Sequence, residues 1–430
     1  MRIALLTAGT RGDVQPYVAL ARALVRAGHA CTVVAPRAFA PLADEYGVAF
    51  HPAGVDEWPT PARLRERAGE MESLSRRGNL AIIRAVMDLF AQHMTRYTAE
   101  ALPACEGVDA VGYGALTSFA ALSIAEKLGI RYFAAMLLAA FPTRELPSPL
   151  FPPGPSWIPG YNRLSHWAAD RIIWRMNRES ALRLRRDVLG LPPWEGWILD
   201  TLRKAAPPVL VGVSPTVLPR PRDWAPYLHM TGYWFLDEPV GWNPPRALAE
   251  FLASGPAPVC IGFGSMPSAD PAGEVQTIVA ALQRAGQRGI ILSGWADLHG
   301  HAGELPQTVL AIDSAPHAWL FPRTAAVVHH GGAGTTGAAF RAGVPQVVVP
   351  VGTDQPFWAH RVVRLGAGPT SIPRKRLTAD RLGAAISRGV GDEGIRARAR
   401  DVGERVRAED GSARAVEVLE RALGGARGTR

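Results

Sequence analysis

Hydrophobic and polar residues follow two spacings along the chain, and these spacings predict alternating strands and helices. Residues 2–8 form a short apolar run, and residues 14–27 then carry apolar side chains at helical intervals until Gly28. A second apolar run, rich in β-branched residues, covers residues 30–35. A strand, a helix and a strand in succession form the βαβ unit from which a doubly wound parallel sheet begins.

The same alternation continues through the chain and is broken by two proline-rich stretches. Residues 146–160 have the composition of a loop, and residues 215–245 that of a linker. Further elements are predicted on both sides of the second stretch: strands at 109–113, 131–136 and 209–213 and helices at 118–128 and 164–189 before it, then strands at 259–263, 289–293, 309–312, 325–329 and 346–350 and helices at 274–285 and 335–341 after it. The chain is therefore expected to be an α/β protein with two βαβ domains.

Composition supports two ordinary globular domains. The 430 residues are 47% hydrophobic and 20% charged, which suffices for two buried cores. No stretch reaches the roughly 18 uninterrupted apolar residues of a membrane span, and the first apolar run is too short for a signal peptide. The three cysteines, Cys31, Cys105 and Cys260, are far apart and suggest neither a disulfide framework nor a metal motif. We therefore expect reduced thiols and a cytoplasmic protein.

The basic charge gives little support for a nucleic-acid partner. The net charge is +9, but arginine is spread along the chain rather than gathered in a stripe with aromatic residues. The densest basic stretch, residues 163–186, also contains Trp, Leu and Ile. We interpret it as an amphipathic surface, which leaves weak peripheral contact with an anionic membrane open.

The strongest chemical signal lies at residues 327–336, where an apolar strand runs into glycines and then a helix. Glycine lets backbone amides approach an anion closely, and the helix start at 334–336 offers unpaired N–H groups. His330 and the threonine hydroxyls add donors, so the stretch suits a diphosphate. A tight turn without a ligand is the alternative for this pattern alone.

Four more loops follow predicted strands of the second domain. Asp354 and Gln355 supply the acceptors and donors that a sugar needs, although an exposed turn would have the same residues. Ser265 offers a hydroxyl to a phosphate. The remaining candidates would contact the nucleotide base by stacking or through peptide groups: Trp295, Ala315 and His317. Open α/β sheets bind ligands at this edge, so the loops are expected to act together.

The first domain has one chemically distinctive loop, which contains Thr10, Arg11, Gly12 and Asp13. Asp13 can serve as a general base on a hydroxyl if burial beside an apolar acceptor raises its pKa. It could equally cap a helix that begins at Pro16. Arg11 would hold the loop or meet a phosphate. The chain has no Asp-x-Asp and no zinc-ligand spacing, so we expect no metal and no cofactor.

Several of these stretches resemble known enzymes. TRGDVQPYVALARAL, GFGSM, PHAWLFPR and HHGGAGTTGAAFRAGVPQVVVPVGTDQPFWAHRV are similar to the GT-B glycosyltransferases of family 1, above all to sterol 3β-glucosyltransferases and bacterial glycopeptide and natural-product glycosyltransferases. The resemblance implies two Rossmann-like domains that face a cleft, and inversion at the anomeric carbon with a UDP- or dTDP-sugar as donor. It assigns Asp13 as the base and Asp354 and Gln355 to the sugar. The implied phosphate contacts are Ser265, His330, Gly332, Gly334, Thr335 and Thr336.

The resemblance also implies a domain plan and an acceptor. Residues 1–220 would bind the acceptor, 221–242 would be a linker, 243–400 would bind the donor, and a helix in 401–430 would cross back to the first domain. An apolar small molecule, such as a sterol, triterpenoid or polyketide, would lie against some of the aromatic and apolar residues of the first domain: Trp58, Phe90, Met136 and Phe141. Either a monomer or a homodimer is compatible with this plan.

One departure from the wider family concerns the base. Many plant members use a histidine in the first loop paired with a distant aspartate, whereas this chain has Asp13. Its partner is not assigned by the sequence, and His51, Asp88 and His93 are unranked candidates.

Three other functions compete with this assignment. A nicotinamide oxidoreductase would need a G-x-G-x-x-G that the first loop lacks. A non-catalytic protein on the same fold would be expected to lose Asp13 or the Asp354–Gln355 pair. An enzyme that acts on a lipid acceptor at a membrane remains the third.

Overall fold

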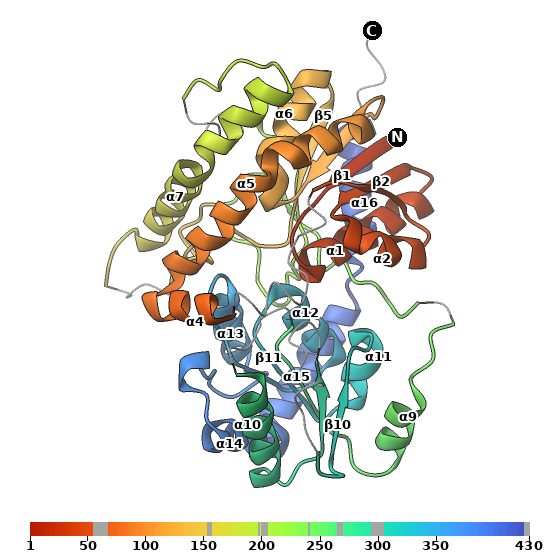
Figure 1. Ribbon diagram of the computed structural model, residues 1–430, viewed down its shortest axis with the longest axis vertical. Coiled ribbons are helices and arrows are strands. Elements are labelled where there is room, and N and C mark those ends of the chain that lie inside the picture. The colour runs from red at the N-terminus through yellow and green to blue at the C-terminus, as the bar shows by residue number, and fades with distance from the viewer. Residues whose placement is uncertain are drawn as a thin grey trace. The chain divides into compact units, whose positions relative to one another are not determined.

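The structure of the protein is a computed structural model, shown in Figure 1. It describes residues 1–54, 68–152, 157–196, 198, 205–239, 241–264, 270–293 and 305–424. Contacts divide the chain into two compact units, and neither is continuous in sequence. The first unit comprises Met1–Trp58, Ile83–Leu236 and Glu409–Arg430, and the second comprises Pro59–Ile82 and Asp237–Ala408. The functional boundaries at 220, 242 and 400 stay predictions.

The first unit contains a parallel sheet of seven described strands. They are β1 (Arg2–Leu6), β2 (Ala30–Ala35), β3 (Ala49–Pro52), β4 (Ala110–Tyr113), β5 (Arg131–Met136), β6 (Val209–Val211) and β7 (Leu228–Met230). Their order in the sheet is β3-β2-β1-β4-β5-β6-β7, and each neighbouring pair is parallel. The five strands expected here are confirmed. The stretch expected to be a linker contains β7, which pairs with β6 through Val209 and Leu228.

Helices of several lengths accompany this sheet. They are α1 (Arg11–Arg26), α2 (Ala40–Glu45), α5 (Asn79–Cys105), α6 (Ser118–Leu128), α7 (Tyr161–Arg183) and α16 (Gly411–Gly424), with short turns η1 (Arg37–Phe39) and η2 (Ala115–Thr117) and the π-helical η3 (Leu184–Val188). The first four residues of α5 belong to the second unit. The predicted helix at 164–189 is therefore α7 followed by η3.

The last helix packs against the first. α16 contacts α1 within the first unit, as Figure 1 shows. Just before it, Glu409 accepts hydrogen bonds from the hydroxyls of Ser214 (2.8 Å) and Thr216 (2.7 Å). A Cβ at Gly232 would lie 3.1 Å from the backbone of Gly411, so the chain passes close to itself here. These contacts attach the end of the described chain to the sheet that contains its beginning.

The second unit contains a parallel sheet of five described strands. They are β8 (Val259–Gly262), β9 (Gly289–Leu292), β10 (Val309–Ile312), β11 (Ala326–His329) and β12 (Gln346–Val348), in the order β10-β9-β8-β11-β12. The helices and turns of this unit are α4 (Ala68–Arg77), α9 (Arg246–Ala253), α10 (Pro271–Arg284), α11 (His317–Leu320), η6 (Phe321–Arg323), α12 (Ala333–Ala342), α13 (Gln355–Arg364), η7 (Arg374–Arg376), α14 (Ala379–Gly391) and α15 (Glu393–Arg407). All five expected strands and both expected helices are confirmed. Two apolar clusters, one with Val328 and Ile278 and one with Val327 and Leu320, form its core.

Each sheet has one point where its strand order reverses direction. In the first sheet this point lies between β1 and β4, and in the second between β8 and β11. Open parallel sheets bind ligands outside the carboxyl ends of the strands at such a point. The loops that follow β1 and β11 are therefore the first places to examine for chemistry.

Three wider expectations can be compared with the described residues. All three cysteines are free and buried, and burial raises the pKa of Cys105 to about 12 and also raises those of Cys31 and Cys260. Within the described ranges no helix has the length and apolar character to cross a membrane. No group of three or more His, Cys, Asp or Glu residues in those ranges could hold a metal ion.

Candidate functional site

Asp13 lies in the first turn of α1, at the carboxyl end of β1. The helix begins at Arg11, earlier than expected, with Thr10 as its N-cap. Asp13 Oδ2 accepts hydrogen bonds from the Thr10 backbone N–H (2.8 Å) and the Thr10 hydroxyl (2.9 Å). This is the half of a capping box in which the third helical residue reaches back to the cap. Asp13 is therefore the third residue of α1, where it supports the N-cap Thr10, and it is not the N-cap of a helix that begins at Pro16.

The backbone around Asp13 fits its side chain closely. Gly9 has a φ of +129°, and a Cβ there would collide with the Asp13 carboxylate. The Thr7 hydroxyl donates to the Asp13 carbonyl at 2.9 Å. The buried Tyr17 hydroxyl, which donates to Ala135 O, has its pKa raised by burial and further by the charge of Asp13. The half-buried Asp13 carboxylate is thus fixed at the switch point of its sheet.

The rest of this loop is more open. Arg11 and Gly12 are exposed, and Arg11 Nε donates to Gln15 Oε1 at 2.9 Å on the surface of α1. Two of the candidate partners for Asp13 are bonded to other residues. Asp88 pairs with Arg84 at 3.7 Å, and His51 Nε2–H donates to Glu100 O at 2.9 Å.

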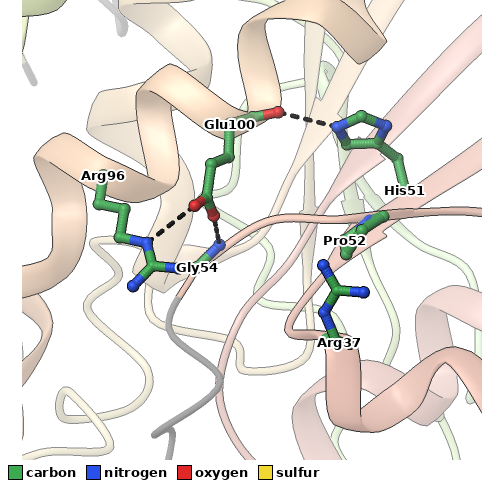
Figure 2. Close-up of a pocket in the computed structure, with 6 residues that line it drawn as sticks. All are labelled: Arg37, His51, Pro52, Gly54, Arg96 and Glu100. Carbon is green, nitrogen blue, oxygen red and sulfur yellow. Dashed lines mark hydrogen bonds and ion pairs between the residues drawn. The ribbon is translucent and has the colours of Figure 1, made fainter.

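His51 also lines a small polar pocket in the first unit, shown in Figure 2. Its walls come from the ends of β2 and β3 and from α5: Arg37, His51, Pro52, Gly54, Arg96 and Glu100. The Glu100 carboxylate accepts from Arg96 Nε (2.8 Å) and from the Gly54 backbone N–H (2.7 Å). The Glu100 carboxylate is therefore already hydrogen-bonded to Arg96 within the pocket wall. None of the residues expected to bind the acceptor lines this pocket.

The acceptor candidates lie at separate places in the first unit. Phe90 is buried on α5, and Met136 ends β5. Phe141 makes an edge-on contact with Trp224, with ring centroids 5.9 Å apart. Trp58 lies outside the described residues, as do Ser265 and Trp295. Among the described acceptor candidates, Met136 is the one that lies at the carboxyl end of a strand.

In the second unit, β11 ends in two histidines with different environments. His329 is fully buried; its Nε2–H donates to Gln346 Oε1 (3.0 Å), and its Nδ1 accepts from the Gly331 N–H (3.1 Å). Burial lowers its pKa to about 3. His329 therefore stays neutral and holds the turn before α12.

His330 points from that turn into a cradle of two glycines. A Cβ at Gly264 would lie 2.8 Å from the ring and one at Gly332 would lie 2.5 Å from it, so both positions need glycine. Burial, and then the charge of Arg374, lower the pKa of His330 to about 4. Its Nδ1 is buried and has no hydrogen-bond partner within the described part of the chain. The His330 imidazole is thus neutral, and its Nδ1 lacks a hydrogen-bond partner among the described residues.

The N-terminus of α12 follows directly, with Gly332 as the N-cap. The first N–H groups of a helix have no intrahelical acceptor, and Gly334 is exposed while Thr335 is partly so. Thr336 is different: its side chain is fully buried, and its hydroxyl donates to Gly332 O at 2.9 Å. In this structure the hydroxyl proton of Thr336 therefore stabilises the helix start, and the expected phosphate contact of Thr336 stays a prediction.

Arg374 is a residue that the sequence did not single out. Its guanidinium lies 4.5 Å from the ring centre of Phe263, at the end of β8, and forms an ion pair with the buried Glu274. Its Nη1 is buried and has no partner among the described residues. A positive charge is therefore held close to His330. No local pattern in the sequence marks this position.

Asp354 and Gln355 lie at the start of α13, after β12. The Asp354 carboxylate accepts from Trp358 Nε1 (2.8 Å) and from the Thr353 hydroxyl (3.1 Å), and burial raises its pKa. Gln355 Oε1 accepts from the Val351 N–H at 2.8 Å, so the oxygen of this amide holds the turn. The pair is built into a shaped loop rather than a freely solvated turn.

Ala315 and His317 lie in the loop after β10 and at the start of α11. The His317 ring stacks on Phe321 with centroids 4.3 Å apart and an interplanar angle of 15°. All the described donor candidates of the second unit thus follow the carboxyl ends of β10, β11 and β12 of one sheet.

Comparison with known proteins agrees with this geometry. Residues 3–147 match the glycosyltransferase family 28 N-terminal domain, and residues 281–421 match the C-terminal domain of erythromycin biosynthesis protein CIII-like proteins. O-mycaminosyltylonolide 6-deoxyallosyltransferase of Streptomyces fradiae is 40% identical over 431 residues, which cover 98% of this chain and 97% of that protein. A sterol 3-beta-glucosyltransferase of Cryptococcus neoformans is 34% identical over 445 residues; these cover 98% of this chain but 27% of that longer protein.

Solved structures with the same fold include two glycosyltransferases at low identity. The calicheamicin glycosyltransferase CalG4 has a TM-score of 0.69 at 21% identity, with 99% of both chains covered. The glycosyltransferase VinC, in complex with dTDP, has a TM-score of 0.66 at 22% identity, with 99% of this chain and 100% of that chain covered. The two parallel sheets are those of the GT-B fold. The chain therefore belongs to the family of GT-B glycosyltransferases that contains natural-product and sterol glycosyltransferases.

Proposed function

We propose that this glycosyltransferase transfers a hexose from a UDP- or dTDP-sugar to a hydroxyl of an apolar small molecule, with inversion and without a metal. In the proposed step, Asp13 accepts the proton of the acceptor hydroxyl, and the resulting oxygen attacks the anomeric carbon. The bond from that carbon to the diphosphate oxygen breaks on the opposite face. The nucleoside diphosphate leaves with the electron pair.

The observation that carries the proposal is the turn between β11 and α12. A helix N-terminus attracts anions through its unpaired N–H groups and its dipole. Here it is combined with His330, whose buried Nδ1 lacks a partner, and with the nearby cation of Arg374. Fixed donors of this kind can stabilise a departing diphosphate without a metal ion.

The remaining parts of the proposal draw on the relatives. The Streptomyces fradiae relative matches over almost its full length and is named for a deoxyhexosyl transfer, and VinC binds dTDP. A dTDP-linked deoxyhexose is therefore the first donor to test. Asp13 qualifies as the base because it is held at the switch point of the first sheet in a half-buried position.

Calorimetry with a donor panel tests the proposal directly. The panel contains UDP-glucose, UDP-galactose, UDP-GlcNAc, dTDP-glucose and a dTDP-deoxysugar, and donor hydrolysis is followed in parallel. Selective binding of a dTDP-sugar would direct the acceptor screen to polyketide and peptide aglycones, and selective binding of UDP-glucose would direct it to sterols and triterpenoids. If the folded protein binds none of them, the non-catalytic alternative is favoured.

A lipid acceptor at a membrane is a second candidate, and α7 together with the turn before it favours it. Trp157, Leu164 and Trp167 are exposed large hydrophobic side chains, with Trp157 at 77% exposure. The guanidinium of Arg171 lies 4.6 Å from the ring centre of Trp167. Exposed indoles beside arginines suit an anionic bilayer surface. Sedimentation with anionic liposomes at low and high salt would detect this contact, and its absence at low salt would remove the candidate.

A further inference from the structure

The loop before Asp354 contains a backbone conformation that needs support. Thr353 has a φ of +57°, which is rare for a β-branched residue. Such a conformation costs about 1–3 kcal/mol and persists only where the surroundings fix it. The loop therefore depends on contacts from outside its own few residues.

The side chain of Asn79 provides those contacts. Its Oδ1 accepts from the Thr353 backbone N–H, and its Nδ2 donates to the Thr353 carbonyl at 3.1 Å. The side chain of Asn79, 274 residues earlier in the chain, thus forms hydrogen bonds with both the backbone N–H and the backbone carbonyl of Thr353. Close by, a Cβ at Gly352 would collide with Ile82, so the first turn of α5 fits closely against the loop. All these residues belong to the second unit.

The conformation of Thr353 in turn orients the Asp354 carboxylate. The Thr353 hydroxyl lies 2.7 Å from Gly352 O and 3.1 Å from Asp354 Oδ1, so these two acceptors share its single proton. If Thr353 relaxed to a negative φ, both the direction of this hydroxyl and the start of α13 would change. The Asn79 bonds therefore act on the carboxylate through one intervening residue.

We propose that Asn79 is a positioning residue that holds Thr353, and through it Asp354, in the geometry that binds the sugar of the donor. The inference rests on the proposed function, because it takes Asp354 as a sugar contact. Asn79 does not touch the sugar itself. Its removal should weaken recognition of the sugar while leaving recognition of the nucleoside diphosphate intact.

A purely structural role for Asn79 is the competing explanation, because it is the first residue of α5. An Asn79→Asp variant separates the two roles. Aspartate at a helix N-terminus is favourable for the helix. It retains an acceptor for the Thr353 N–H, but it loses the amide donor and places a carboxylate oxygen against the Thr353 carbonyl. A structural role predicts no loss, and a positioning role predicts a loss.

The experiment measures KM for the nucleotide sugar, kcat, and the affinity for the nucleoside diphosphate alone, with the melting temperature as a check on folding. Asn79→Asp and Asn79→Ala should each raise KM for the sugar donor about tenfold, the effect of losing one or two backbone hydrogen bonds. Diphosphate affinity should stay within about twofold, because the diphosphate makes no use of Asp354. Leu80→Ala, at an exposed neighbouring position of the same helix turn, is the matched control and should leave KM unchanged.

A Thr353→Gly background tests whether Asn79 and Thr353 act as a unit; because it lacks the hydroxyl that donates to Asp354, it raises KM by itself, and the effect of Asn79→Ala is measured relative to it. Glycine adopts positive φ readily, so Thr353→Gly reduces the need for the Asn79 bonds. In that background the effect of Asn79→Ala should shrink to less than about threefold, since coupled residues are not additive. Equal effects in the two backgrounds, or wild-type KM in Asn79→Asp, would overturn the inference.

Asp354→Ala distinguishes failure of the inference from failure of the proposed function. An unchanged KM for the sugar donor in this variant would remove the sugar role of Asp354, and the inference with it. A raised KM in Asp354→Ala together with a wild-type KM in the Asn79 variants would overturn the inference alone.

Discussion

Replacement of Asp13 by asparagine separates the two roles that the geometry gives this residue. Asparagine retains a side-chain oxygen that can accept from the Thr10 N–H, so most of the cap is kept. Loss of an entire N-terminal cap costs about 1 kcal/mol. For a domain with about 5 kcal/mol of stability, that loss leaves only about one molecule in a thousand unfolded. Instability alone therefore cannot reduce activity measurably.

Loss of a general base has a much larger effect. A positioned base contributes about 10²–10⁴-fold to the rate, which corresponds to about 3–5 kcal/mol in the activation barrier. We expect Asp13→Asn to lower kcat by that factor while the affinity for the nucleoside diphosphate stays unchanged. Initial rates with the donor identified by calorimetry, at saturating acceptor, measure the first quantity, and calorimetry with the diphosphate measures the second.

An aspartate at the start of another helix provides the control. Asp392 caps α15, and its carboxylate accepts from the Ile395 N–H at 3.1 Å. Asp392→Asn should change the free energy of unfolding about as much as Asp13→Asn and leave kcat at the wild-type value. A fall in kcat of less than tenfold in Asp13→Asn would refute the base role, and Asp13 would then only support the start of α1.

Three further outcomes follow from the second unit. His330→Ala should weaken the affinity for the nucleoside diphosphate about tenfold and lower kcat, because a partner for the phosphates is lost; normal affinity by calorimetry would contradict this. The free energy of unfolding should fall as the pH drops from about 6.5 to 4. The reason is that the folded-state pKa values of His329 and His330 are lowered to about 3 and about 4, so these rings bind protons in that window mainly in the unfolded chain. Urea titrations across this range measure the change, and a free energy of unfolding that does not vary with pH would contradict the prediction. A chelator such as EDTA should leave turnover unchanged, and activity that is lost and then restored by a divalent cation would show that a metal takes part.

Elements with a strong periodic pattern could be predicted from the sequence. Short apolar runs gave the strands on both sides of each switch point, since buried parallel strands are nearly uniformly apolar. The start of α1 was placed too late because Arg11, Gly12 and Asp13 are polar and resemble a loop. β7 was missed because it has three residues within a proline-rich stretch. In both cases contacts outside the local pattern decide the structure.

The candidate site, too, could be predicted from the sequence only in part. The turn at His330 could be predicted, because a strand, glycines and a helix follow one another in the sequence. The bonds that hold Thr353 could not, because Asn79 lies 274 residues away and nothing near either residue signals the other. The direction of the Thr336 hydroxyl could not be predicted either, because a threonine near a helix start can turn its hydroxyl inward to the backbone.

The packing of α16 against α1 has a consequence for the order in which the protein is made. A ribosome releases residues 237–408, which supply the second sheet, before it releases the helix that completes the first unit. Until then the partners of Ala415, Val416 and Leu419, all buried in the finished protein, remain uncovered on the nascent chain. Domains usually mature in the order of synthesis. Here the unit that is begun first is finished last, and an apolar surface of it stays without its final cover throughout the synthesis of the other.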